Sequence, residues 1–332
     1  MRAVPGAVIR RIAEVSSGPE SRDQLLKSVG LSPHADPIGR RHEIVEEDAY
    51  YDILERATAE EDFALPFRYA GTVEVDDFGA LGLAFKTASS VREALLRMVR
   101  YILVLSDTVE YELRDVADGG AFVLNRPSHR RGARLANECA LAADISLLRQ
   151  ITGTKMTPIA VSFRHRQPKS TKHHRAFFGC PVRFDDRVNA LHLSNENLQT
   201  RTRLADEGLS AFILATLDEM KRAKTERTLP AQVHRAVTDS LPDGGHNKPQ
   251  IARRLGMSER TLHRRLAEHG ETFQAIASRA RREAAESLLA NGASSLAEVA
   301  FLTGFSDQSA FTRAFKTWTG QTPRKFRTSA ET

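Results

Sequence analysis

The sequence is poor in cysteine and has no long apolar segment. Only Cys139 and Cys180 occur among 332 residues, too few for a disulfide scaffold, so we expect a protein of the reducing cytoplasm. The longest apolar run, residues 101–105, is far shorter than the ~20 residues of a membrane span, and no signal-peptide segment opens the chain. Nucleophile-elbow, metalloprotease and phosphate-loop motifs are missing. We therefore expect no enzyme, no cofactor, no metal and no membrane contact.

The excess of positive charge lies in the C-terminal third. The whole chain has a formal net charge of +6. Residues 228–332 contain 15 lysines and arginines against 10 acidic residues, whereas residues 1–227 contain 33 against 32. A basic surplus confined to one region is typical of a surface that meets phosphates, so nucleic acid is the expected partner of that region.

The same short pattern occurs twice in this region. A small alanine lets a second helix cross closely, a glycine permits a backbone reversal, and a serine is expected to cap the next helix. The equivalent positions are Ala252, Gly256, Ser258, Leu262 and Leu266 in the first copy, and Ala300, Gly304, Ser306, Phe311 and Phe315 in the second. The pattern predicts two helix-turn-helix units, each with a second helix that reads DNA.

The outer faces of the two second helices carry groups that bond phosphates or guanine. At about 100° per residue, an inward set of Leu262 and Leu266, or of Phe311, Phe315 and Trp318, leaves a polar set outside. The outward residues are Arg260, His263 and Arg264 in the first unit, and Ser309, Thr312, Arg313 and Lys316 in the second. These residues are candidates for DNA contact.

Residues 273–290 link the two units and are rich in strong helix formers, ending at Asn291-Gly292. Such a helix is roughly 30 Å long, close to the ~34 Å between successive major grooves on one face of DNA. It therefore predicts binding in two successive grooves. The alternative is a helical bundle whose helix pairs only pack on one another.

Residues 229–327 resemble the DNA-binding domain of the AraC/XylS family of bacterial transcription regulators. Residues 304–316, with Gly304, Phe305, Asp307, Gln308 and Arg313, and then Gly320, Thr322, Pro323, Phe326 and Arg327, follow the family signature in order. The resemblance implies base contacts from Arg260, His263 and Arg264 in the first unit, and from Gln308, Ser309, Thr312 and Arg313 in the second.

The preceding two-thirds of the chain has the pattern of a separate α+β domain. Strand-like alternation around the turn at residues 118–120, and at 159–164, 182–184 and 190–193, predicts a small mixed sheet. Helices are predicted at residues 5–15, 21–29, 46–59, 77–85, 131–151 and 171–178, and at 90–104 behind a capping box of Ser90 and Glu93. The fold class is therefore an α+β domain followed by an all-α domain.

Residues 161–165, 174–184 and 189–194 are similar to the N-terminal region of an AraC subgroup whose effector domain is of an arabinose-binding-like type. The resemblance implies a sensor of a small molecule without identifying it. The predicted order of elements differs from the β-barrel cupin of the sugar-binding members of the family.

Two groups of residues in this domain are candidate ligand sites. Arg130 and Arg134 lie at the start of the helix at 131–151, where the helix dipole favours an anion, and His129 and Tyr101 could complete a pocket for an acidic or amphipathic effector. A solvated basic edge is the alternative. Tyr101 and Tyr111 could form pocket walls with hydroxyl groups, and core packing is the alternative for both. His173, His174 and Cys180 could bind metal or haem, but a cysteine between Gly179 and Pro181 is more often a small buried residue at a turn.

These observations predict a one-component transcription regulator, an activator, with three parts. Residues 1–205 would sense an effector and dimerise, 206–227 would form a connecting helix, and 228–332 would bind DNA. The expected partners are promoter DNA, a small-molecule effector, RNA polymerase and a second copy of the chain, at the nucleoid in the cytoplasm. A repressor, a metal or haem sensor, and a DNA-modifying enzyme are the alternatives. Alkyl-transfer enzymes need more cysteines, and a DNA-bending protein would not need an effector domain.

Overall fold

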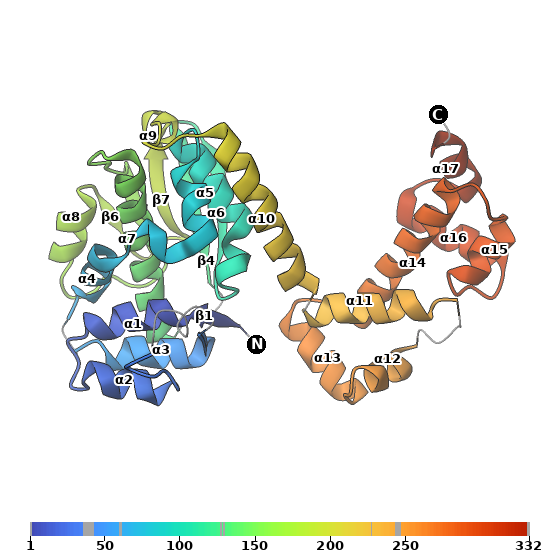
Figure 1. Cartoon of the computed structure of the whole chain (residues 1–332), viewed down its shortest axis with the longest axis horizontal. Coiled ribbons are helices and arrows are strands. Elements are labelled where there is room, and N and C mark those ends of the chain that lie inside the picture. Colours follow the sequence, from blue (N-terminus) through green and yellow to red (C-terminus); the bar gives the residue numbers. More distant parts are fainter. Residues whose placement is uncertain are drawn as a thin grey trace. The chain divides into compact units, whose positions relative to one another are not determined.

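The computed structural model describes residues 2–35, 43–59, 62–126, 128, 130–226, 228–242 and 247–330 (Figure 1). The chain divides into two compact units, Met1–Lys221 and Arg222–Thr332, and each is described by itself. Among the described residues, no helix combines the length and the apolarity needed to cross a membrane.

The N-terminal unit contains helices around a five-stranded mixed sheet, as the sequence predicts. Its strands are β1 (Ala3–Pro5), β2 (Ile44–Glu46), β3 (Glu110–Val116), β4 (Gly119–Asn125), β5 (Ala160–Ser162), β6 (Val182–Arg183) and β7 (Asn189–Ser194). Its helices are α1 (Gly6–Glu14), α2 (Arg22–Ser28), α3 (Glu47–Arg56), α4 (Leu65–Thr72), the 3-10 helix η2 (Val75–Phe78), α5 (Gly79–Lys86), α6 (Val91–Leu105), α7 (Arg131–Thr152), α8 (Lys172–Phe178), α9 (Asn195–Gln199) and most of α10 (Glu207–Glu226).

The large sheet has the strand order β3-β4-β7-β5-β6, antiparallel except for the parallel pair β5 and β6. Alternate residues of β4 face opposite sides. Phe122 and Leu124 belong to the main core shared with the helices, whereas Ala121 and Val123 form a small cluster with Ala190 on the other face. Helices therefore cover the face of the sheet that carries Phe122 and Leu124, and most of the apolar core lies on that face.

Helix α7 is the central element of this unit, because most of its 22 residues are buried. It packs against α3 and α4, and Gly132 makes the crossing with α3 possible. A Cβ at Gly132 would lie 2.3 Å from the carbonyl oxygen of Tyr51, so no larger residue fits there. Gly153, with φ of 68°, ends the helix in the left-handed conformation, as predicted.

Several local predictions need correction. The hairpin turn is residues 117 and 118, and Gly119 and Gly120 already pair with β3. Ser90 caps α6 through the Glu93 amide, but the Glu93 carboxylate binds Ser89 instead of closing the capping box. The sequence pattern also missed β1, β2, α4 and α9, because each is short and depends on partners distant in sequence.

The C-terminal unit is all helical. It contains α11 (Leu229–Ser240), α12 (Lys248–Arg254), α13 (Glu259–Glu268), α14 (Phe273–Ala290), α15 (Leu296–Leu302), α16 (Gln308–Thr319) and α17 (Pro323–Ala330). Two apolar cores occur in it, one formed with α11 to α13 and one with α15 to α17. Helix α14 contributes Ile276 and Ala280 to the first core and Ala285 and Leu289 to the second.

Candidate nucleic-acid interface and internal pocket

The first helix pair, α12 and α13, has the geometry of a helix-turn-helix. Ala252 is buried at the crossing, and Gly256 reverses the chain with φ of 69°. The hydroxyl of Ser258 accepts a hydrogen bond from the amide of Thr261 at 3.2 Å, which confirms Ser258 as the cap of α13. Leu262 and Leu266 are buried in the first core, so the polar residues between them face solvent.

The second pair, α15 and α16, repeats this geometry with a different cap. Ala300 is buried, and Gly304 has φ of 77°. Asp307 caps α16 by accepting the amide of Ala310 at 2.8 Å, so the prediction that Ser306 is the cap is wrong. A carboxylate binds helix-terminal amides more strongly than a hydroxyl does, and Ser306 donates to that carboxylate at 3.2 Å.

The second core is aromatic. Phe311 and Phe315 are fully buried, and Phe326 of α17 packs edge-on against Phe315 at 5.4 Å between ring centroids. Trp318 is only partly buried and contacts Phe305 at 5.8 Å. These rings hold α16 in a defined rotation about its axis.

All but one of the proposed DNA-contacting side chains are exposed. On α13 they are Arg260, His263 and Arg264, and on α16 they are Gln308, Ser309, Arg313 and Lys316. Thr312 is half-buried, and its hydroxyl donates to the Gln308 carbonyl at 2.8 Å. Sequence reasoning thus separated the outer face of each helix from its core face, apart from this one residue.

Arg264 is engaged in an ion pair with Glu268 one turn along α13, with a distance of 2.7 Å between Nη1 and Oε1. Both side chains are more than half exposed, so the pair contributes little to stability. An incoming phosphate or guanine can therefore displace Glu268 at small cost. Arg265, also exposed, adds a further positive charge on the same helix.

One continuous helix couples the two helix pairs. At 1.5 Å per residue the 18 residues of α14 extend about 27 Å. Because its two ends are buried in different cores, tilting one helix pair relative to the other would require bending α14 or opening a core. This arrangement favours a fixed separation of α13 and α16.

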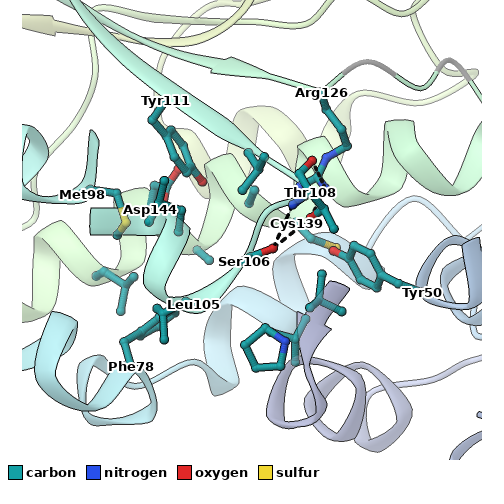
Figure 2. Close-up of a pocket in the computed structure, with 18 of the residues that line it drawn as sticks. Tyr50, Phe78, Met98, Leu105, Ser106, Thr108, Tyr111, Arg126, Cys139 and Asp144 are labelled. Carbon is teal, nitrogen blue, oxygen red and sulfur yellow. Dashed lines mark hydrogen bonds between the residues drawn. The ribbon is translucent and has the colours of Figure 1, made fainter. Parts of the chain in front are cut away.

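The N-terminal unit contains an internal pocket of about 90 Å³ with mostly apolar walls (Figure 2). Apolar side chains from the N-terminal segment, α6 and α7 surround it, together with the rings of Tyr50, Tyr69, Phe78 and Tyr111. Two buried charged groups, Arg126 and Asp144, complete its lining. Among these residues the sequence suggested only Tyr111 as a possible pocket wall, because the pocket joins segments that are distant along the chain.

The residues proposed as effector contacts do not gather in this pocket. The Tyr101 hydroxyl donates to Asp218 of α10 at 2.9 Å, so this side chain fastens α10 to α6. Arg130 forms ion pairs with Asp48, Asp52 and Glu55 of α3. His129 lies outside the described residues.

The start of α7 is already occupied by a carboxylate of the chain itself. The Gly132 amide donates to Glu55 Oε1 at 2.7 Å, and Arg130 lies 3.2 Å from the same oxygen. The expectation of an anion site at this helix terminus is therefore corrected, because Glu55 fills the position. Arg134 lies elsewhere, in a polar depression with Arg126, Asn137 and Arg166.

The residues considered for metal or haem binding have other roles. His174 is buried with its Nε2 3.0 Å from Glu138, whereas His173 is exposed. Burial raises the pKa of Cys180 to about 11, despite the opposing effect of Arg149, so its sulfur stays a thiol. In the part of the chain that the structure describes, no group of three or more histidine, cysteine or acidic residues forms a metal site.

The two paired helix-turn-helix units define a DNA-binding protein, and the separate α+β unit with its internal pocket is typical of a regulator that senses a ligand. Comparison with known families agrees. Residues 21–202 match the arabinose-binding N-terminal domain of AraC transcription regulators, and residues 251–329 match a helix-turn-helix domain. The chain belongs to the AraC family of transcription regulators, and it is a regulator rather than an enzyme.

Two bacterial regulators and one solved crystal structure are similar to this chain. The chain is 29% identical to the ornithine utilization regulator of Pseudomonas aeruginosa over 77% of its length and 76% of the relative. It is 31% identical to the regulator VirS of Mycobacterium tuberculosis over 57% of its length and 56% of the relative. The crystal structure of the regulator CdpR from Pseudomonas aeruginosa aligns with a TM-score of 0.46 and 21% identity, covering 92% of this chain and 96% of that one.

Proposed function

We propose that the protein is a one-component activator of transcription that places α13 and α16 in two successive major grooves of promoter DNA. The observation that carries this proposal is the single helix α14, about 27 Å long, whose ends are buried in both cores and which connects two helix pairs with exposed polar faces. A separation of ~34 Å is needed for two helices to enter successive major grooves. Residues 228–332 would then be the DNA-binding domain and residues 206–227 the connecting helix.

Base-specific contacts are assigned to the exposed arginines. Arg264→Ala should cost roughly 1 to 3 kcal/mol and relax base preference in one half of the operator, and Arg313→Ala should do the same about one helical turn away. Lys316 would contact phosphate, so Lys316→Ala should weaken binding to all sequences equally. His263, Arg260, Gln308, Ser309 and Thr312 complete the proposed interface.

Footprinting of full-length protein on the operator, combined with competition by single-base variants, tests this assignment. Arg114→Ala, in the β3–β4 hairpin of the other unit, is the matched control and should leave both measurements unchanged. Equal losses on every sequence for Arg264→Ala and Arg313→Ala would show that both arginines touch only phosphate. Protection of a single groove would refute the two-groove arrangement.

A second copy of the chain is the proposed partner of α10. Leu209, Phe212 and Met220 lie within about 80° on one side of this helix, next to the side that packs on the core. Leu209 and Met220 are nearly half exposed, and Phe212 is 72% exposed. A stripe of large apolar side chains on a helix that joins the two units is well placed to bury itself against its own copy. The proposed dimer interface of residues 1–205 would then also include α10.

Sedimentation of Phe212→Ser over a range of concentrations tests the dimer. The variant should dissociate at concentrations where the wild type is dimeric, and its DNA affinity should fall ~10²-fold or more, because the second DNA-binding unit is no longer tethered. Leu83→Ser, at another exposed leucine, is the control. A wild type that stays monomeric at tens of micromolar would remove the dimer.

The effector is proposed to bind in the N-terminal unit and to shift the protein between two arrangements on DNA. The protein would change transcription by contacting RNA polymerase at the nucleoid. Transcription in vitro with purified polymerase, with and without the operator, decides the sign: increased transcript supports an activator, and decreased transcript supports the alternative of a repressor with the same architecture.

A further inference from the structure

The internal pocket contains an acidic side chain, Asp144, with a carboxylate oxygen that accepts no hydrogen bond from any described residue. Asp144 of α7 is buried, and in the part of the chain that the structure describes no cation lies within ion-pair distance of it. Figure 2 shows the Tyr111 side chain beside this carboxylate, and its hydroxyl lowers the pKa of Asp144. Oδ2 of Asp144 has no hydrogen-bond partner. A buried carboxylate oxygen without a partner is costly, so a ligand that supplies one would be strongly favoured.

The other charged group of the pocket, Arg126, uses most of its donors within the fold. Arg126 donates from Nε to Asn137 at 3.0 Å and from Nη1 to the hydroxyl of Thr108 at 2.9 Å. Its guanidinium also lies over the Tyr50 ring, 5.9 Å from the centroid. Arg126 therefore has few donors left for an anion, whereas Asp144 retains an acceptor.

The walls around Asp144 also suit a cation. Tyr50, Tyr69, Phe78 and Tyr111 line the pocket, and aromatic faces attract positive charge. Met98, Leu105 and Leu147 provide apolar surface between these rings. An engineered cavity of 150 Å³ accepts the six carbons of benzene, so about 90 Å³ accommodates about four heavy atoms.

We propose that this pocket binds a small amphipathic cation, a protonated primary amine on a short apolar chain, with its ammonium against Oδ2 of Asp144. This inference rests on the proposed effector role of the N-terminal unit and specifies the chemistry of the ligand. The Tyr111 hydroxyl holds the carboxylate in place, and the aromatic rings surround the ammonium and the first carbons.

The pH dependence supplies an independent mark of the site. Burial raises the pKa of Asp144 to about 7, partly offset by the Tyr111 hydroxyl, so the carboxylate becomes charged between pH 6 and pH 8. The other ionisable groups facing it are Tyr50, Tyr69, Tyr111, Cys139 and Arg126, all with pKa values raised out of this range, and nearby Asp77, which is paired with Arg11. An alkylamine with a lysine-like pKa of ~10.4 stays cationic throughout.

The test is calorimetric titration of the full-length protein with n-propylamine, 1-propanol and propionate at pH 6 and pH 8. At pH 8 n-propylamine should bind at least ten-fold more tightly than 1-propanol, and this preference should shrink at pH 6. In Asp144→Asn the preference should disappear, whereas Asp218→Asn, which changes a carboxylate outside the pocket, should retain it. Tyr111→Phe removes the hydroxyl that lowers the pKa of Asp144 and should move the pH midpoint of amine binding upward.

Equal binding of amine and alcohol by the wild type, or an amine preference that survives in Asp144→Asn, would overturn the inference. Tighter binding of propionate would assign the pocket to an anion at Arg126. Operator binding by the same preparations without any amine keeps the two proposals apart. If the protein binds the operator but not the amine, only the amine pocket is refuted, and if it binds no DNA, the proposed function itself is refuted.

Discussion

One carboxylate, Glu138 of α7, links two histidines from different elements of the N-terminal unit. His165 and His174 each place Nε2 3.0 Å from a different oxygen of Glu138, and all three side chains are almost completely buried. His165 Nδ1 lies 3.0 Å from the carbonyl of Arg166. Because the groups nearest both nitrogens of His165 can only accept hydrogen bonds, they favour its imidazolium form. Glu138→Gln keeps the shape of the side chain and removes its charge.

The sign of the pH effect follows from two shifts. Burial opposes the charge of Glu138, but hydrogen bonds from His165 and His174 hold its pKa below the ordinary value. Burial also opposes the charge of His165, but Glu138 raises its pKa above the ordinary value. The stabilising contribution of the ionised Glu138 is present above the pKa of ~4.3 that it has in the unfolded chain. The stabilising contribution of the protonated His165 is lost as the pH rises through the raised pKa that it has in the folded protein. Both contributions are therefore present at about pH 5 to 6.

Breaking a buried charge pair by removing one partner costs about 3 to 5 kcal/mol, and a retained amide hydrogen bond reduces this, so Glu138→Gln should cost about 3 kcal/mol near pH 5.5. For a unit of this size, such a loss lowers the midpoint of thermal unfolding by about 6 to 12 °C. The loss should become smaller as the pH rises through the raised pKa of His165, because the imidazole then loses its charge.

Thermal unfolding of full-length protein at pH 5.5, 7 and 8.5, followed by circular dichroism and calorimetry, measures this loss. Glu112→Gln is the matched control, because its carboxylate pairs with Arg114 on an exposed strand. It should leave the free energy of unfolding nearly unchanged, because exposed ion pairs contribute little to stability. A Glu138→Gln protein as stable as the wild type at pH 5.5, or one destabilised equally at all three pH values, would refute the reasoning.

Two further predictions concern the DNA-binding unit. Gly256→Ala should destabilise it by about 1 to 2 kcal/mol, because a φ of 69° is unfavourable for alanine. No atom lies within 4 Å of the added carbon, so a steric clash contributes nothing to this cost. Gly208→Ala, in α10 with no positive φ, should instead be neutral or stabilising by up to about 1 kcal/mol, and thermal unfolding distinguishes the two. Phe315→Ala should cost about 3 to 5 kcal/mol and abolish binding to the half-site read by α16, as measured by footprinting; unchanged protection there would show that the aromatic core does not position that helix.

The sequence alone determined the helix-turn-helix units, and the structure shows why. Gly256 and Gly304 need positive φ. The buried pairs Leu262 and Leu266, and Phe311 and Phe315, are each four residues apart, and α14 consists of strong helix formers. Each of these signals acts within a few residues along the chain, so the pattern is readable without knowledge of the fold. The cap of α16 was misplaced by one residue because Ser306 and Asp307 are adjacent and both can cap.

Only the tertiary structure shows which side chains of the N-terminal unit are paired with one another and which line a pocket. Arg130 has the position of an anion-binding residue in the sequence, yet Glu55, 75 residues earlier in the chain, occupies that helix terminus. In the sequence Asp144 is one acidic residue of a long helix. In the folded unit it lines a pocket together with Tyr50, Tyr111 and Arg126. Burial and ion pairing depend on segments that meet only after folding, and they set the pKa of Asp144, whereas helix caps and turns depend on neighbours in sequence.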